Sequence, residues 1–459
     1  MRSFFKREAS RTRRERRTLN SLCVIGIALL VLVLTHAAPL TRTACATEVP
    51  EKAPGSGPLE LTEREAEAEA VRELKFKEAL TYKPLKADEL VRFLENEIRE
   101  QYGKDQLQNL LLAYEKLGLI KSADGLVELL VQAYASEIMA FYDHRTDTVH
   151  MIEDPTLPRA LQQVTELHEL IHALQDQHFD LGTLPIEDVH HTDRANAAMA
   201  LVEGDATLAT FQYAAEHMRF SFGDSMRIVS RAFQPGPAAP YLFRREMSFI
   251  YFDGLELARA LHTKGGWAAL NKAFADPPAS TEQVLHYKHK YLDERDAPTP
   301  VELPDCTPIL GEGWTRVAED VLGELYTQVL FRQHLSFLRA GKPSRGWDGD
   351  RLHLYRAGDE TVLIWRTVWD TEKDAEEFAE AYRKVLLRKF RTSDKNVTQD
   401  PLGLVVQGET ATAILHTSEC DVLTVEAPSE TIARAVTEHI RAGDANTEHQ
   451  TAEEALEAQ

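Results

Sequence analysis

The sequence predicts an α+β protein with a mainly helical first part and a second part that combines strands with helices. Residues 60–305 contain long segments with apolar residues at helical spacing. Residues 306–442 contain short alternating runs that are rich in β-branched and aromatic residues. The chain of 459 residues is too long for one core, so the two patterns are assigned to two domains.

The first 46 residues have the layout of a secretory signal peptide. Arginines crowd residues 1–20, an apolar run extends from Leu22 to Leu34, and Ala44-Cys45-Ala46 has the form of a cleavage site. A run of 13 apolar residues is short for a membrane span, which favours cleavage and export to the periplasm, the cell envelope or the medium. The alternative is an uncleaved N-terminal membrane anchor that extends through Ala38.

Residues 47–59 form a linker rich in proline and glycine, and the helical part follows it. Apolar periodicity and turn residues predict three helices and then a short hairpin around Asp143–Asp147. The helices are expected at Asp88–Tyr102, Asp105–Leu117 and Gly125–Tyr134, and the strands at Ile138–Tyr142 and Thr148–Ile152.

The next predicted helix, from about Thr156 to Phe179, contains His168-Glu169-Leu170-Ile171-His172. Two histidines four residues apart lie side by side on a helix and can both bind one Zn²⁺ ion, while the glutamate can act as a general base on water. A chance match would more often lie on an incoherent or exposed segment. This helix instead has one apolar stripe beside a polar arc, which favours the zinc site. The stripe consists of Val164, Leu167, Ile171 and Leu174, and the arc adds Thr165, Gln175 and Asp176 to the histidines.

A catalytic zinc needs a third protein ligand, and the alanine-rich helix predicted from Asp193 to Glu216 offers Glu203. Gly204 follows it directly. Glycine inside a helix costs about 1 kcal/mol relative to alanine, so its presence indicates that two backbones pack closely there. A carboxylate in such an apolar run needs a partner, which favours a ligand over a solvated side chain. Asp205 could orient a ligating histidine or could simply face solvent.

The second part is predicted to be a two-layer α+β domain followed by an acidic tail, residues 443–459, expected to be disordered. Trp347, Trp365 and Trp369 could form a binding surface, but aromatic residues in such a domain are more often core. The expected elements are strands at His353–Arg356 and Val362–Trp369, a helix from Asp370 or Thr371 to Phe390, strands at Leu402–Gln407, Ala411–His416 and Val422–Glu426, and a helix at Ser429–Arg441.

The segment from His168 to Leu181, HELIHALQDQHFDL, resembles the active-site helix of gluzincin metallopeptidases. Together with LVEGDA at Leu201–Ala206, it is similar to a poorly characterised group of secreted or surface metallopeptidase-like proteins of bacteria and archaea. The resemblance implies a zincin-like domain with an edge strand that binds extended peptides. Candidates for that strand are Phe141–Tyr142 and Thr148–Met151.

By position, the resemblance makes His168, His172 and Glu203 zinc ligands and Glu169 the general base, and Asp176 matches the aspartate that follows the motif in thermolysin-like members. Gluzincins of the thermolysin type place an aspartate four residues after the ligand glutamate, where this chain has Thr207. The support of the ligands must therefore differ.

The stretch from Pro277 to Tyr291 also resembles this group of metallopeptidase-like proteins. Peptide hydrolysis develops negative charge on the carbonyl oxygen, and His286 in this stretch is the first candidate for the side chain that donates a hydrogen bond to it. A surface histidine is the alternative reading, and Tyr251 and Arg245 are further candidates.

The charge and the cysteine content limit the kinds of partner and metal site that the protein can have. Without the leader the net charge changes from −21 to −28, which should repel nucleic acid and anionic membranes; a membrane contact is expected only if the N-terminal segment is uncleaved. No CxxC pair is present, which excludes a cysteine zinc site, and Cys306 and Cys420 could form a disulfide or be two buried thiols.

These observations predict an exported zinc-dependent peptidase that acts on a protein or peptide substrate. The alternative is an envelope binding or scaffolding protein that retains a metallopeptidase fold with a structural or vestigial zinc. Glu169 favours the enzyme, because a purely structural site has no use for a glutamate between the histidines.

Overall fold

A computed structural model describes residues 62–103, 105–135, 138–153, 159–217, 239–336 and 341–457, with side chains up to Gly443. The predicted leader, the predicted linker and the expected start of the motif helix at Thr156 lie outside the described residues.

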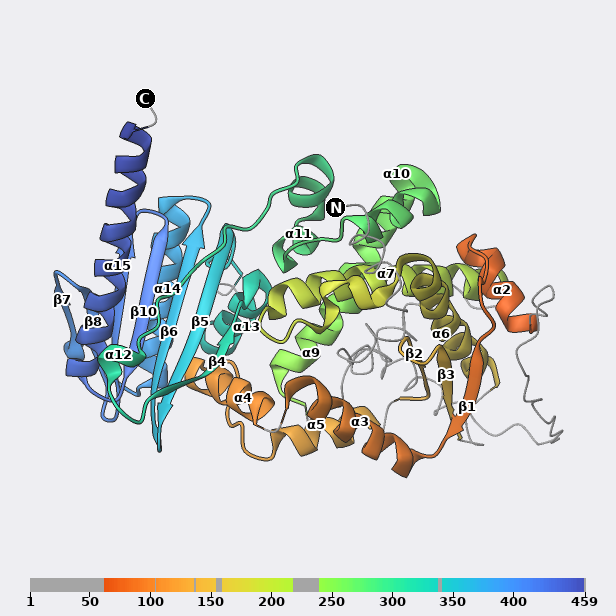
Figure 1. The fold of residues 1–459 in the computed structure, drawn as a ribbon, viewed down its shortest axis with the longest axis horizontal. Helices are drawn as coiled ribbons and strands as arrows, with labels where there is room; N and C mark the ends of the chain where they lie inside the picture. Colours follow the sequence, from red (N-terminus) through yellow and green to blue (C-terminus); the bar gives the residue numbers. More distant parts are fainter. Residues whose placement is uncertain are drawn as a thin grey trace, which may run out of the picture.

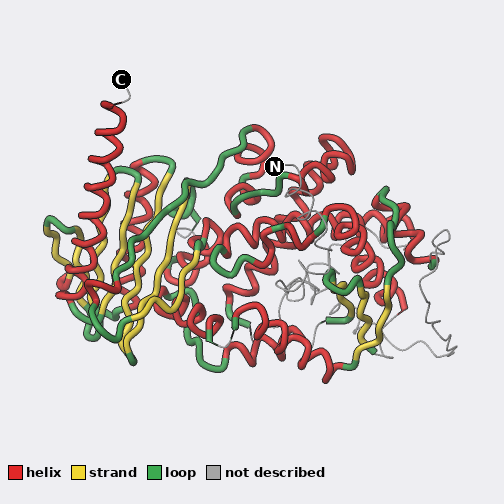
Figure 2. The backbone as a smooth tube through the Cα atoms, in the orientation of Figure 1, coloured by secondary structure: helices red, strands yellow, loops and turns green. Residues whose placement is uncertain are grey.

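The first part is mainly helical, as the sequence predicts (Figures 1 and 2). Helices α6 and α7 are the two longest helices up to residue 217, and they pack against each other near the centre of this part. The helices are α2 (Glu63–Arg72), α3 (Ala87–Tyr102), α4 (Gln106–Leu117), α5 (Leu126–Ala135), α6 (Arg159–Phe179), η1 (Leu181–Thr183), η2 (Pro185–Glu187), α7 (Thr192–His217), α9 (Tyr241–Ser248), η3 (Phe249–Asp253), α10 (Gly254–Ala275), α11 (Thr281–Leu285) and η4 (Lys288–Asp293).

The predicted hairpin is present, as β2 (Ala140–Asp143) and β3 (Thr148–Ile152). A strand that the sequence did not predict, β1 (Thr81–Leu85), pairs with β3 in parallel, so the strand order is β1-β3-β2. The central place of β3 excludes Thr148–Met151 as an edge strand, and that prediction is wrong because it considered the hairpin alone. β2 is an edge of the sheet, and Phe141–Tyr142 lies in it.

Helices α7 and α10 touch through their backbones. A Cβ atom added to Gly204 would lie 2.2 Å from the carbonyl oxygen of Gly254, and one added to Gly254 would lie 2.2 Å from that of Ala200. The glycine beside Glu203 therefore does mark a close approach of two helices, as the sequence predicts.

The second part is built on an antiparallel sheet with the strand order β4-β5-β6-β10-β9-β8-β7 (Figure 1). Strands β4 and β7 were not predicted. The elements are α12 (Thr307–Leu310), β4 (Thr315–Asp320), α13 (Gly323–His334), β5 (Trp347–Ala357), β6 (Glu360–Trp369), α14 (Glu372–Lys389), η6 (Asp394–Asn396), β7 (Val397–Asp400), β8 (Gly403–Gln407), β9 (Thr412–Ser418), β10 (Asp421–Ala427) and α15 (Glu430–Glu457).

The sheet is covered on both faces, so the prediction of two layers is wrong. Along β6, Trp365 packs against Tyr382 of α14 with ring centroids 5.4 Å apart. Ile364 belongs instead to a separate apolar cluster with Val436 of α15. Successive residues of a strand point to opposite faces, so α14 and α15 lie on opposite sides and the domain has three layers.

The backbone of α15 continues to Glu457, whereas a disordered tail was predicted from residue 443. The prediction weighed the low hydrophobicity of this segment, while its alanines and glutamates are strong helix formers.

Trp347, Trp365 and Trp369 are all buried, as predicted for core residues, in a cluster that also contains residues of α6 and α7. Cys306 and Cys420 are both free thiols. Among the helices that the structure describes, none is both long enough and apolar enough to span a bilayer.

Candidate metal centre

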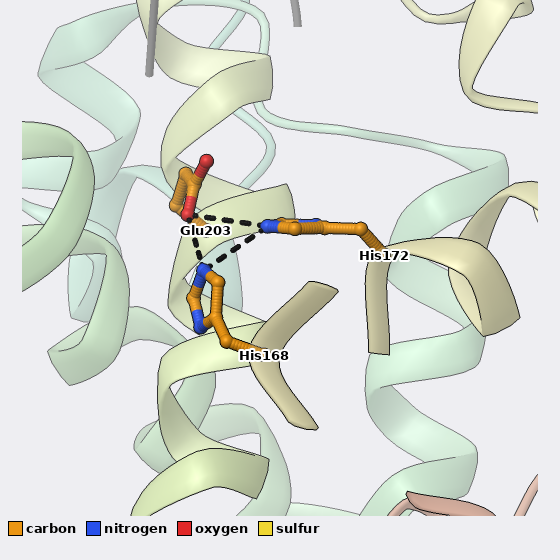
Figure 3. Close-up of side chains that lie close together, drawn as sticks. All are labelled: His168, His172 and Glu203. Carbon is orange, nitrogen blue, oxygen red and sulfur yellow. Dashed lines mark hydrogen bonds and ion pairs between the residues drawn. The ribbon is translucent and has the colours of Figure 1, made fainter. Parts of the chain in front are cut away.

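Helices α6 and α7 bring His168, His172 and Glu203 together (Figure 3). The Nε2 atoms of the histidines are 3.1 Å apart, and Oε2 of Glu203 lies 3.2 Å from Nε2 of His168 and 3.5 Å from Nε2 of His172. All three side chains are buried. The residues that the sequence assigned to the metal therefore form one group that could hold an ion.

The spacing of these atoms fits a tetrahedral zinc site. Zinc binds histidine nitrogen and carboxylate oxygen at about 2.0–2.1 Å, which places neighbouring ligand atoms of a tetrahedron roughly 3.3–3.4 Å apart. The three observed distances, 3.1, 3.2 and 3.5 Å, bracket that value. The group could therefore hold a metal ion with ligand distances of this length.

Gln175 fixes the tautomer of His172. Its amide nitrogen donates to the Val202 carbonyl at 2.9 Å and to the Asp205 carboxylate at 2.7 Å, so its Oε1 faces the imidazole. Nδ1 of His172 lies 2.8 Å from that oxygen and must donate to it. The proton of a neutral His172 is then on Nδ1, and Nε2 has the lone pair that a metal needs.

Asp205 is held in turn by Arg72, whose Nε lies 3.0 Å from the carboxylate. Both side chains are 0% exposed, and the guanidinium stacks over Trp267 at 4.4 Å. The possible role of Asp205 in orienting a histidine is thus exerted through Gln175, along a chain from Arg72 through Asp205 and Gln175 to His172.

Thr210 fixes the tautomer of His168, as Gln175 does for His172. Its hydroxyl donates to the Ala206 carbonyl at 2.8 Å, so its oxygen accepts from Nδ1 of His168 at 3.3 Å. Thr207, at the position where thermolysin-like gluzincins have an aspartate, is buried with its hydroxyl unpaired among the described residues. The support that the sequence could not locate therefore comes from Gln175 and Thr210.

Glu169 is buried on the same helix as the two histidines, and its Oε2 accepts the Tyr142 N–H of β2 at 2.9 Å. Burial raises the pKa of Glu169 to about 8. Asp176 accepts the Tyr142 hydroxyl at 3.0 Å and the Leu181 N–H at 3.0 Å, and burial raises its pKa to about 6. Asp176 therefore positions β2 and does not contact a ligand.

The pKa values of the three ligand side chains depend on one another. Burial opposes ionisation of Glu203, but His172 and His168 together outweigh burial and lower the pKa of Glu203 to about 2. Burial also opposes the charged form of His172, and Glu203 overcomes that effect and raises the pKa of His172 to about 9. Burial lowers the pKa of His168. A proton thus lies where a cation would bind, and a metal ion would displace it.

His286 is not brought into this group. It ends α11, and its Nε2 lies 2.9 Å from Glu324 of α13. The first residue of α11, Thr281, contacts Asp193 at the start of α7, ten residues and about 15 Å along the helix from Glu203. The structure therefore does not support His286 as a donor at the metal centre.

Of the other two candidate donors, Arg245 forms an ion pair with Asp253 at 2.8 Å. Tyr251 is buried, and its ring centroid lies 6.5 Å from that of His168. Among the three candidates, Tyr251 is therefore the one that the structure places beside a ligand.

The sequence interpretation missed Thr210 and Arg72. Thr210 had a usable signal, because seven residues separate it from Glu203 and place both on one face of α7. Arg72 had none, since it lies 133 residues before Asp205 and only the folded chain brings them together.

A domain family of unknown function, DUF8575, matches residues 310–437. The matched range covers most of the sheet domain, and the residues of the metal centre lie outside it. No curated protein matches the chain, and no solved structure does.

Proposed function

We propose that the protein is an exported zinc-dependent peptidase in which His168, His172 and Glu203 hold the metal and Glu169 is the general base. The observation that carries the proposal is the buried Glu169 beside three ligand atoms at tetrahedral spacing. The assignment of the helical part as a zincin-like domain belongs to the same proposal.

A zinc ion bound there would polarise the scissile carbonyl and make water a stronger acid. Glu169 then takes the proton of the attacking water and returns it to the departing amine. The Tyr142 N–H donates to Oε2 of Glu169 and so holds the carboxylate in place. The Nδ1–H groups of His172 and His168 donate to Gln175 and Thr210, which keeps both imidazoles in the tautomer that the metal needs.

The place of β2 supports a peptide as the substrate. β2 is an edge strand, and Tyr142 within it contacts the general base directly. All four residues of β2 are buried, so the segments that cover this edge must move before an extended peptide can add to it through main-chain hydrogen bonds. Such addition would set the scissile bond near the metal. We therefore assign the edge-strand role to Phe141–Tyr142.

The test compares wild type with Glu169→Gln in the mature, zinc-loaded protein, with denatured casein as the probe substrate. We expect about one zinc per chain in both proteins, and a loss of at least about 10²-fold in cleavage by the variant, since removal of a general base has that effect. The matched control is Glu166→Gln, one turn earlier on α6, which should cleave as wild type does.

Two results would contradict the proposal in different ways. One zinc per chain with no cleavage of casein or of a broad peptide library would reject the peptidase and favour a scaffold with structural zinc. A His168→Ala variant that keeps its full zinc content would reject the site itself.

A further inference from the structure

A second feature of the helical part is a cavity of about 170 Å³ between α3, α4, α5, α7 and α9. Its wall is mainly apolar, with Leu94, Ile98, Val131, Met199 and Phe243 among the lining residues. An apolar cavity on the order of 150 Å³ can hold benzene, so this one can hold a large side chain.

The cavity lies beside α7, the helix that presents Glu203, although none of the three ligand residues lines it. Met199 of α7 lines it, and Glu203 lies four residues further on the same face, about 6 Å along the helix axis. Ile250 also lines it, and the next residue, Tyr251, packs near His168. A peptide bound at the metal centre would therefore have the cavity within reach of a neighbouring side chain.

The polar groups of the wall are acidic or neutral. Glu187, Asp188 and Glu246 line the cavity, and no Lys, Arg or His is among its described lining residues. Glu187 faces His144 at 3.8 Å, and Asp188 is paired with Arg194.

Among the described residues, Glu246 instead faces the neutral side chains of Tyr326 and Asn196, and burial raises its pKa to about 7. The side-chain oxygen of Gln101 is buried in the same wall without a hydrogen-bond partner among the described residues. The wall thus offers acceptors and no cation to match them.

We propose that this cavity receives a lysine or arginine side chain of the substrate, with the charged end at Glu246 and the aliphatic stem along the apolar wall. Such side chains combine a long apolar stem with a cationic head, as the wall requires. An apolar side chain of the same size would leave the buried Gln101 oxygen without a partner and would bring no positive charge to Glu246, which disfavours it. The link to cleavage rests on the proposed peptidase function.

The first test is independent of catalysis and uses benzamidine, a cation, and benzamide, its neutral isostere, as probes of the zinc-loaded protein. By titration calorimetry we expect benzamidine to bind at least about tenfold more tightly than benzamide, an increment of about 1.4 kcal/mol. Glu246→Gln should abolish the difference. Glu256→Gln, an exposed glutamate on α10, is the matched control and should preserve it.

Equal binding of the two probes to wild type, or an undiminished preference in a folded Glu246→Gln, would overturn the proposal. If the variant does not fold, the comparison on wild type still decides.

The second test maps the sites at which denatured casein is cut. Wild type should cut where lysine or arginine occupies one fixed position, and Glu246→Gln should lose that preference while it still cuts. No cleavage together with a benzamidine preference would reject the peptidase and keep the cation pocket. Cleavage with no preference for basic residues would reject the pocket and keep the peptidase.

Discussion

Gln175 shows how a neutral side chain can decide what a ligand does. Its amide can face His172 in one orientation only, because Val202 and Asp205 both accept from its nitrogen. The imidazole is therefore set before any metal arrives. Such partners of ligands commonly change metal affinity by 10- to 100-fold.

We expect Gln175→Leu to lower zinc affinity by roughly 10- to 100-fold, because the hydrogen bond that orients His172 is lost. Competition with a chromogenic chelator measures the change. Gln163→Leu, 12 residues earlier on the same helix, is the control and should leave affinity unchanged. Equal affinity in wild type and Gln175→Leu would show that the ring is oriented by its packing alone.

At the residue scale, local spacing was sufficient to predict part of the centre. His168, Glu169 and His172 follow from a helical repeat, and Glu203 follows from the glycine next to it in an alanine-rich helix. The partners of the ligands were harder to find, because hydrogen bonds between helices depend on their rotation and offset. Neither quantity is encoded in a local pattern.

At the scale of elements, the contact between α7 and α10 fixes the helix that presents Glu203. The two helices meet at Gly204 and Gly254 without an intervening side chain. Their separation is set by main-chain atoms, which cannot adopt another rotamer.

We expect Gly204→Ala to destabilise the protein by at least about 1–3 kcal/mol, because the new methyl group would overlap the Gly254 carbonyl. Urea unfolding measures the loss. Gly443→Ala, within α15 and with open space around the added atom, should instead be neutral or stabilise by up to about 1 kcal/mol. Equal midpoints for Gly204→Ala and wild type would show that α7 and α10 can move apart.

The sequence predicted α3–α7, α14, α15 and the hairpin, since each has a local period, but it did not predict α2 or α9–α13 as individual helices. It missed β1, because Pro84 interrupts that short strand and its pairing with β3 is parallel and distant in sequence. The edge of the sheet could not be assigned without it.

At the scale of the whole molecule, buried aspartates join the two parts. Asp320 of β4 accepts the Thr192 N–H of α7 at 2.8 Å and the Tyr114 hydroxyl of α4 at 2.6 Å, and both bonds connect the sheet domain to the helical part. The next residue of α7, Asp193, accepts the Thr281 N–H at 2.9 Å. Burial raises the pKa of Asp193 to about 8, with Asp350 and Asp320 adding to the effect and the Thr281 hydrogen bonds opposing it.

Stability should therefore depend on pH at this junction. The unfolded chain loses the Asp193 proton near pH 4, whereas the folded protein keeps it to about pH 8. Between these values the folded state binds more protons, so the free energy of unfolding falls as pH rises from about 4 to 8. We expect urea midpoints of wild type to fall more steeply over this range than those of Asp193→Asn. Identical slopes would show that Asp193 is ionised in the folded protein.

The sequence predicted the division into a helical and a mixed part, yet it missed the third layer. Alternation of apolar and polar residues indicates a sheet with one wet face, and β6 has apolar residues on both faces. A continuous apolar strand does not say which helix covers which side.

The series of hydrogen bonds from Arg72 through Asp205 and Gln175 to His172 affects how long a metal ion stays bound. Arg72 is the last residue of α2, the first described helix, and it supports a ligand 100 residues later in the sequence. Segments of a folded protein open at free energies well below that of global unfolding. Each departure of α2 from its place would release Asp205 and loosen the hold of Gln175 on His172. The residence time of a bound ion should therefore follow the opening rate of α2 rather than the lifetime of the whole fold.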